Sequence, residues 1–179
     1  MTAGEGHVLR LERTVRAPRV AVYGALTDAA TLGEWWGPRG FAARAVAFDA
    51  RVGGAYLIVM QPPDGEAFRL SGEFRRVEPS TTLAYTFRWE PPHRDDRETM
   101  VTIALEDAGG DTIVRLAQGG FATEERYLLH EHGWSESFDR LELFLAESRG
   151  CRSVRGGGQW HAADPESMVP PLAFTNRQS

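Results

Sequence analysis

Two histidines near the middle of the chain's longest regular segment are the first candidates for chemistry. His130 and His132 lie two residues apart in a stretch whose spacing predicts a helix. Residues two apart on a helix point about 200° away from each other, so this pair cannot hold one metal ion. The chain has a single cysteine, Cys151, so a zinc site built on several thiolates is also excluded. We predict no metal site, and we expect these histidines to face solvent or to make one pocket contact.

The other groups that could catalyse a reaction do not form a recognisable arrangement. Ser135 and Ser137 stand in the sequence GWSES, which is not the turn that activates a serine nucleophile. Asp49, Glu73 and Glu98 occur singly, at strand ends or on outward faces, where solvated carboxylates are common. A buried acid or arginine inside a pocket is left open as an acid–base group, but the sequence identifies none. We therefore predict no catalytic residue.

The composition excludes several classes of enzyme and partner. All 20 basic residues are arginine, and Schiff-base enzymes, pyridoxal-phosphate enzymes and P-loop NTPases all need a lysine. No glycine-rich loop opens a helix after a strand, so we expect no nucleotide and no other cofactor. The net charge is −5 and no basic stripe is present, which argues against nucleic acid and against an anionic membrane surface.

The location of the protein is also predicted from composition. No apolar run reaches the length of a membrane span, and the N-terminal sequence MTAGEGHVLRLERTV has no apolar core of a signal peptide. The single cysteine excludes an internal disulfide. We expect a soluble cytoplasmic protein, and the sequence leaves a homodimer open.

The element that must position His130 is the segment 121–148, which is the longest stretch with sustained helical periodicity. Thr123 is predicted as its N-cap, and Gly150 is expected to end it. Gly133 costs about 1 kcal/mol in a helix interior, so we expect a kink or a close contact there. The apolar stripe is expected to contain Tyr127, Glu131, Trp134, Phe138, Leu141 and Leu145, widened by Leu128, Phe144 and Ala146. The opposite, polar face carries Glu125, Glu136, Asp139, Arg140 and Glu147.

The chain before this helix predicts a sheet. A first strand is predicted at 8–15, and two short helices follow it. The first helix begins at Ala17-Pro18, the two helices are separated near Asp28, and the second ends at Gly37-Pro38. Six further strands are expected at 41–49, 55–60, 68–77, 83–89, 99–106 and 112–118. A helix with large aromatic residues on one face needs a broad apolar partner. We therefore predict an α+β fold in which a curved antiparallel sheet of about seven strands packs against the long helix.

The inner face of this sheet is rich in aromatic residues, and two interpretations of it stay open. The rings either fill the core or line a pocket for a small molecule between the sheet and the helix. Trp35 and Trp36 are adjacent, so at most one faces the core and the other is a candidate for the cavity mouth. The candidate ligand-binding residues are Trp36, Phe41, Tyr56, Ile58, Met60, Phe68, Phe74, Tyr85, Phe87, Trp89, His130, Trp134 and Phe138.

A series of short motifs gives the chain a family resemblance over residues 8–148. In order, the motifs are Ala17-Pro18, Thr27-Asp28, Trp35-Trp36-Gly37-Pro38 with Gly40-Phe41, Asp49-x-Arg51-x-Gly53-Gly54, Pro63-Asp64-Gly65, Tyr85-Thr86, Glu98-Thr99-x-Val101-Thr102 and His132-Gly133-Trp134. Their combination resembles the SRPBCC (START/Bet v 1-like) superfamily, in the branch named after the C-terminal domain of the activator of Hsp90 ATPase. The resemblance implies a helix-grip fold, in which the sheet wraps the C-terminal helix around a cavity for apolar ligands.

The resemblance leaves three hypotheses for the function, because a fold does not fix a function. The first is the binding of a small hydrophobic or aromatic molecule by a carrier, a sensor or a self-resistance protein, with a stress role among the options. The second is an enzyme of the polyketide aromatase/cyclase type, in which a pocket acid or His130 moves protons. The third is an interaction domain that stimulates a chaperone ATPase.

The last part of the chain differs in composition from the rest. We predict a helix-grip domain at 1–148 and a Gly/Pro-rich tail at 149–179, which has three consecutive glycines and no periodicity. The tail is expected to be flexible, although Trp160 and Phe174 give it apolar residues that could dock on the sheet or on a partner.

Overall fold

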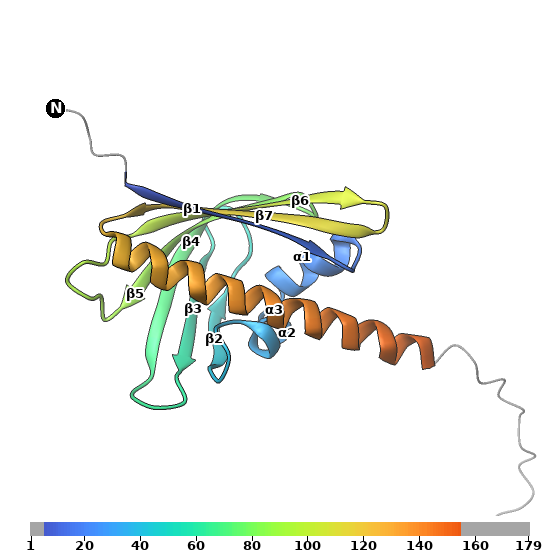
Figure 1. Ribbon diagram of the computed structural model, residues 1–179, viewed down its shortest axis with the longest axis horizontal. Coiled ribbons are helices and arrows are strands. Elements are labelled where there is room, and N and C mark those ends of the chain that lie inside the picture. Colours follow the sequence, from blue (N-terminus) through green and yellow to red (C-terminus); the bar gives the residue numbers. More distant parts are fainter. Residues whose placement is uncertain (1–5, 155–179) are drawn as a thin grey trace, which may run out of the picture.

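The computed structural model describes residues 6–154, and in it one curved antiparallel sheet wraps around one long helix (Figure 1). The strands are β1 (His7–Val15), β2 (Ala42–Phe48), β3 (Ala55–Gln61), β4 (Phe68–Glu78), β5 (Thr82–Glu90), β6 (Thr99–Ala108) and β7 (Asp111–Phe121). The helices are α1 (Arg19–Thr27), α2 (Ala29–Trp35) and α3 (Glu124–Val154). The predicted α+β fold, with two short helices after the first strand, is confirmed.

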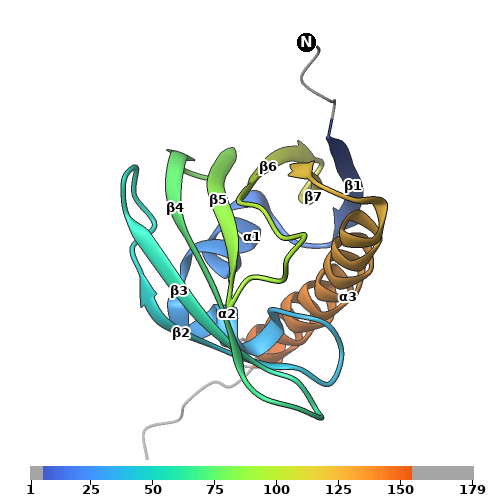
Figure 2. The same ribbon diagram turned by 90° about the vertical axis from the view of Figure 1, so that its left-hand side faces the viewer.

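The sheet has the order β1-β7-β6-β5-β4-β3-β2, and all its neighbouring strands are antiparallel. Figure 2 shows how the sheet curls from β2 round to β1 while α3 closes the open side. Alternation along the strands turns one set of side chains toward α3, and the buried members of that set include Leu70 and Phe74 of β4 and Leu83 and Tyr85 of β5. This concave face holds the core.

The long helix begins as predicted and ends later than predicted. The hydroxyl of Thr123 accepts a hydrogen bond from the backbone N–H of Arg126 at 3.3 Å, which caps the first turn. Trp134, Phe138, Leu141 and Leu145 are all buried, so the central apolar stripe is confirmed. The expected end at Gly150 is wrong, since α3 continues to Val154. Gly150 has no positive φ, and a glycine alone does not end a helix whose backbone hydrogen bonds can continue.

Two outer members of the predicted stripe do not face the core. Leu128 is 51% exposed and Ala146 is exposed. Leu128 precedes Trp134 by six residues, which rotates it about 240° around the helix axis from that buried ring. Ala146 lies toward the C-terminal end of α3, which extends past the strands (Figure 1).

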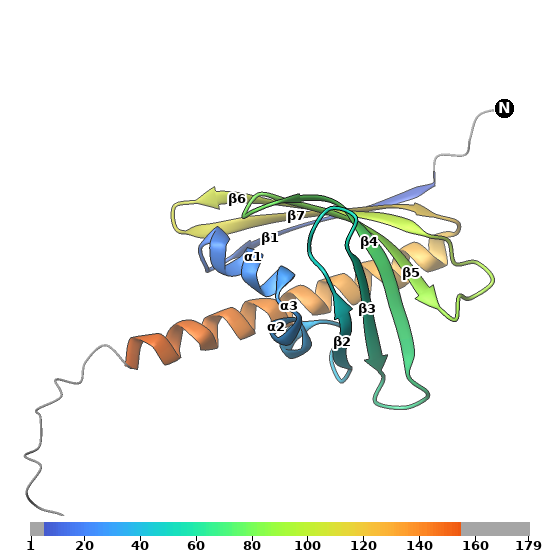
Figure 3. The ribbon, with the colours of Figure 1, turned by 180° about the vertical axis from the view of Figure 1, so that it is seen from behind.

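The two short helices lie inside the curl of the sheet and contact α3 (Figure 3). Asp28 separates them, because it ends α1 and its carboxylate accepts a hydrogen bond from the backbone N–H of Thr31 at 2.7 Å to begin α2. Leu26 and Leu32 are buried, and the Trp35 indole N–H donates to the carbonyl of Ala25 at 3.0 Å. These contacts fill one end of the space between the sheet and α3.

The predicted tail is covered only in part. Residues 149–154 continue α3, and residues 155–179 lie outside the described part of the chain. The division into a domain at 1–148 and a tail at 149–179 therefore stays a prediction.

Candidate ligand-binding cavity

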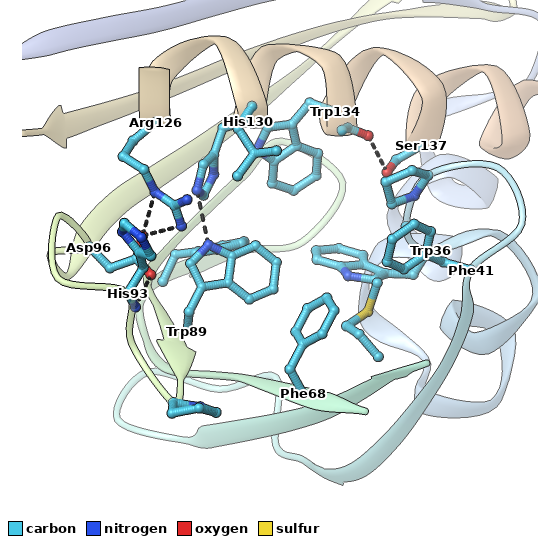
Figure 4. Close-up of a pocket in the computed structure, with 17 residues that line it drawn as sticks. Trp36, Phe41, Phe68, Trp89, His93, Asp96, Arg126, His130, Trp134 and Ser137 are labelled. Carbon is cyan, nitrogen blue, oxygen red and sulfur yellow. Dashed lines mark hydrogen bonds and ion pairs between the residues drawn. The ribbon is translucent and has the colours of Figure 1, made fainter. Parts of the chain in front are cut away.

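A cavity of about 290 Å³ lies between the first half of α3, the ends of β3, β4 and β5, and the loop after α2 (Figure 4). Its walls are mainly apolar, and charged groups stand at one end. The lining residues are Trp36, Gly37, Pro38, Phe41, Met60, Phe68, Phe87, Trp89, Pro91, His93, Asp96, Arg126, Leu129, His130, Gly133, Trp134 and Ser137.

The aromatic rings of the walls pack edge to face around an open centre. Trp36 meets Trp134 with ring centroids 5.2 Å apart at 77°, and Phe68 meets Trp89 at 5.1 Å and 70°. Phe87 lies 5.0 Å from Trp89 at 85°. Edge-to-face pairs of this kind support each other without stacking flat. The rings therefore form a wall that exposes aromatic surface to the cavity (Figure 4).

A chain of hydrogen bonds behind this wall fixes His130 in one neutral form. The indole N–H of Trp89 donates to His130 Nε2 at 3.0 Å, so that nitrogen carries no proton. His130 Nδ1 then carries the proton and donates to Gln118 Oε1 at 3.2 Å. The same amide oxygen accepts the Trp134 indole N–H at 2.7 Å, and Gln118 Nε2 donates to Thr99 Oγ1 at 2.8 Å. These bonds fix the ring of His130 and the amide of Gln118 in one orientation.

Burial and a neighbouring charge keep His130 uncharged. Burial, with a smaller contribution from the positive charge of Arg126, lowers the pKa of His130 from 6.5 to about 4, while the charge of Asp96 opposes this shift. The lone pair of Nε2 is already used by Trp89. His130 is therefore a positioning group for the indole rings at neutral pH, and it is not a free base in this arrangement.

An ion pair closes one end of the cavity. Arg126 Nε donates to Asp96 Oδ1 at 2.7 Å, and the two side chains are only 16% and 7% exposed. The backbone N–H of His93 donates to the other carboxylate oxygen of Asp96 at 2.6 Å. The two charges compensate each other, so this end of the cavity is polar and carries no net charge.

The loop 36–41 forms another wall, and α3 holds it in place. The guanidinium of Arg140 lies within 3.0–3.2 Å of the carbonyl oxygens of Trp36, Gly37, Pro38 and Phe41. Glu136 and Asp139 bind the backbone N–H and the guanidinium of Arg39, each at 3.2 Å. The polar face of α3 therefore positions one wall of the cavity in addition to meeting solvent.

Of the thirteen sequence-predicted binding residues, eight line the cavity and five lie deeper in the core. Eight of them line the cavity, namely Trp36, Phe41, Met60, Phe68, Phe87, Trp89, His130 and Trp134. Four others, Tyr56, Ile58, Phe74 and Tyr85, surround a residual space of only about 10 Å³ deeper in the core. Phe138 has no exposed surface, and its ring packs 5.8 Å from Trp134. His132, the partner of His130 in the sequence argument, is exposed on the outer side of α3.

Apart from His130, the polar residues of the site were not predicted from the sequence. Gln118 could have been found, because it alternates with the buried Val114 and Leu116 and so points inward. Arg126 and Asp96 come from two different segments, and no sequence pattern joins them. The other lining residues that were not predicted are Gly37, Pro38, Pro91, His93, Leu129, Gly133 and Ser137.

Other groupings in residues 6–154 suit a ligand of this kind less well. No three His, Cys, Asp or Glu side chains of these residues come together as a metal site, and no helix among them is long and apolar enough to cross a membrane. A second hollow of about 280 Å³ lies on the opposite face of the sheet. It is lined by ion pairs such as Arg75 with Glu73 and Arg88 with Glu90. Its charged walls do not favour an apolar molecule.

A sheet that grips a long C-terminal helix around a mainly apolar cavity defines a START-like domain with the helix-grip fold. The chain belongs to the activator of Hsp90 ATPase homolog 1-like family, whose model matches residues 16–146, and this family lies within the SRPBCC superfamily. The fold is in general that of a ligand-binding domain. The family resemblance predicted from the motifs is confirmed.

Solved structures support this assignment. An AHSA1 protein from Silicibacter pomeroyi is 30% identical with a TM-score of 0.69, and the match covers 79% of this chain and 99% of that one. A protein from Chromobacterium violaceum is 27% identical with a TM-score of 0.72, over 77% of this chain and 96% of that one. CalU16 from Micromonospora echinospora is 21% identical with a TM-score of 0.60, over 87% and 86% of the two chains, and shows the fold alone. No curated protein matches this sequence.

Proposed function

We propose that the protein binds a small, flat, apolar or aromatic molecule in the cavity between the sheet and α3. The observation that carries this proposal is the cavity of about 290 Å³, which stays open although aromatic side chains surround it. Exposed aromatic surface in a concave site is the usual feature of a small-molecule pocket. As a binding module of this kind, the protein acts as a carrier, a sensor or a sequestering resistance protein in the cytoplasm.

The size of the cavity limits the ligand. A volume of about 290 Å³ lies at the lower end of the range for ligand pockets. A molecule with two or three fused rings suits this space. We expect micromolar affinity, which is about 8 kcal/mol of binding free energy.

The polar groups favour binding over catalysis. An enzyme of the aromatase/cyclase type needs a pocket group that moves protons, but both ring nitrogens of His130 are engaged. Asp96 is held by Arg126 and by the backbone N–H of His93. Only the name of the family suggests a chaperone partner, and a name carried by other members is a weak argument for this chain.

The proposal is tested by titrating a panel of polyketides, flavonoids and fatty acids while the tryptophan fluorescence of the protein is recorded. The test variant is Phe68→Arg, which places a charge at a half-buried position of the cavity wall. The matched control is Val52→Arg, which makes the same kind of change at a residue that is 66% exposed in a turn. We expect the wild type and the control to bind equally, and Phe68→Arg to lose at least tenfold in affinity.

Two results would contradict the proposal. If no compound of the panel binds the wild type, the cavity is not a site for flat apolar molecules. If Phe68→Arg is folded by circular dichroism and binds as tightly as Val52→Arg, the ligand binds elsewhere on the protein.

A further inference from the structure

The mouth of the cavity lies between the loop 91–98, which joins β5 to β6, and the first turns of α3. Most of the lining residues are buried or half-buried, and the exposed ones are Pro91, His93 and Leu129. Leu129 is 51% exposed although it borders the cavity. A side chain that borders both the cavity and the solvent marks the place where the two meet. A ligand therefore passes between the loop 91–98 and α3.

The loop 36–41, which forms another wall of the cavity, is bound to α3 at many points. Arg140 donates to four of its carbonyl oxygens, and Glu136 and Asp139 bind its Arg39. Moving this loop away from α3 would break all these bonds together. The loop 36–41 is therefore a fixed wall.

The loop 91–98 is bound to α3 at one point. Asp95 and Asp96 are its only half-buried residues, and the other six are exposed. Among residues 6–154, the bond of Asp96 to Arg126 is the one side-chain hydrogen bond or ion pair that joins this loop to another element. A segment with so few bonds to its surroundings opens at a low cost in free energy. The loop 91–98 is therefore the movable side of the mouth.

The contact itself is well shielded from water. Arg126 Nε donates to Asp96 Oδ1 at 2.7 Å, and the side chains are 16% and 7% exposed. Asp96 also closes a turn within the loop, because its carboxylate accepts the N–H of His93 at 2.6 Å and its own N–H donates to the carbonyl of His93 at 2.9 Å. Figure 4 shows Arg126 reaching from α3 to Asp96 beside His93. A charge-assisted bond in this setting is stronger than an exposed one and is screened less by salt.

We infer that the ion pair of Arg126 with Asp96 is the latch of the cavity. When the pair is formed, the loop 91–98 lies against α3 and the ligand is retained. When the pair breaks, the turn around Asp96 moves away from α3 and the ligand exchanges with the solvent. This inference rests on the proposed function, and it adds the device that regulates access to the same site.

A latch has a kinetic signature that distinguishes it from a group that binds the ligand. The bond between Arg126 and Asp96 is internal to the protein, so it stabilises the closed form of the empty and of the occupied cavity alike. Its loss therefore raises the rates of entry and exit together and leaves the affinity nearly unchanged. Loss of a direct contact with the ligand would instead raise mainly the rate of exit.

The test measures how fast 9-fluorenone, a flat tricyclic probe, enters and leaves the cavity, by stopped-flow recording of tryptophan fluorescence. The test variant Arg126→Met/Asp96→Asn removes both charges together, and the oxygen of the new amide can still accept the N–H of His93. The matched control is Arg76→Met/Glu78→Gln, which makes the same kinds of change in an exposed ion pair of β4 that does not line the cavity.

We expect the association and dissociation rate constants both to rise about tenfold in the test variant, the effect of losing one charge-assisted hydrogen bond. The dissociation constant, which is their ratio, should stay within about threefold of the wild-type value. The control should keep both rate constants.

The outcomes separate the inference from the proposed function. Unchanged rate constants in the folded test variant would overturn the inference and leave the proposed function standing. A rise in the dissociation rate constant alone would also overturn it, because Arg126 and Asp96 would then hold the ligand and not the loop. If the wild type does not bind the probe, both fail.

A second variant keeps the inference testable if the double variant does not fold. Asp96→Asn alone preserves the size of the side chain and replaces the bond between opposite charges by a weaker one to a neutral amide. Both rate constants should then rise in parallel by about threefold. Wild-type rate constants in Asp96→Asn would overturn the inference.

Discussion

The concave face of the sheet has two halves that are both rich in aromatic residues. One half is a packed core, and the other borders an open cavity. In the first half, Tyr56, Phe74 and Tyr85 interlock with ring centroids 5.5–5.7 Å apart, and they leave a space of only about 10 Å³. In the second half, Phe68 and Trp89 continue the same two strands, β4 and β5, beside a cavity of about 290 Å³. Aromatic residues on an inner face therefore do not decide between a core and a cavity.

The segments that cover each half determine whether it is packed or open. The first half is filled by α1 and α2, whose Leu26 and Leu32 reach its residual space. The second half is covered by the loop 36–41 and by α3, where Gly37 and Gly133 line the cavity without a side chain. Arg140 holds that loop at its carbonyl oxygens, so the loop cannot collapse into the space without losing these bonds.

The largest expected effect contrasts one phenylalanine from each half on the same strand. Phe74→Ala should cost about 4 kcal/mol, because a fully packed ring is replaced by a new void. Phe68→Ala should cost about 1 kcal/mol, because Phe68 is half-buried and already borders an open space. Urea denaturation of the two variants measures both values. Equal losses would mean that the two halves are packed alike.

A second prediction assigns acid sensitivity to the open half. The pKa of His130 is lowered from 6.5 to about 4, mainly by burial, so the unfolded state binds this proton more readily than the folded state. The stabilisation is complete above about pH 6.5 and is lost as the pH falls toward 4, with a total on the order of 3 kcal/mol. Burial raises the pKa values of Tyr56 and Tyr85 in the packed half, so these groups stay neutral throughout this window.

The pH dependence is measured as the free energy of unfolding at several pH values from 7 to 4. His130→Gln is the control, because its side chain does not titrate and the carboxylates of the rest of the chain are unchanged. The wild type should lose more stability than His130→Gln across this range. Parallel curves for the two proteins would contradict the assignment of a buried neutral histidine to this cavity.

A smaller effect is expected at Gly133, which lines the cavity from the middle of α3. A Cβ atom built there would lie 3.8 Å from Pro38 Cγ, an ordinary contact, so the helix has room for alanine. Gly133→Ala should therefore stabilise the protein by about 1 kcal/mol through helix propensity. Thermal melts measure the gain. A loss of stability would show that α3 and the loop 36–41 pack more tightly at Gly133 than the distance to Pro38 indicates.

The sequence predicts the elements of both halves but not the difference between them. Periodicity is a local property, and for this reason the strands and the stripe of Trp134, Phe138 and Leu141 are recovered from it. Tyr56 and Phe68 have the same parity and similar side chains, and only the distant α1, α2 and loop 36–41 decide which of them is packed.

Polar contacts between distant segments are the part that sequence patterns do not contain. Arg140 stands on the polar face of the predicted helix, where solvent exposure is the ordinary expectation. The loop residues that Arg140 contacts lie about a hundred positions earlier in the chain. The pairing of Arg126 with Asp96 likewise depends on how the 91–98 loop meets the start of α3.

The central claim is that ligands enter the open half and leave the packed half unchanged, and the indole N–H signals test it directly. Trp36, Trp89 and Trp134 line the cavity, whereas Trp35 is fully buried in the packed half and donates to Ala25. In a nitrogen-15 titration with 9-fluorenone, the three cavity signals should shift in a saturable way and the Trp35 signal should stay in place. Saturable binding that moves Trp35 as much as the others, or that moves none of the three, would contradict the account.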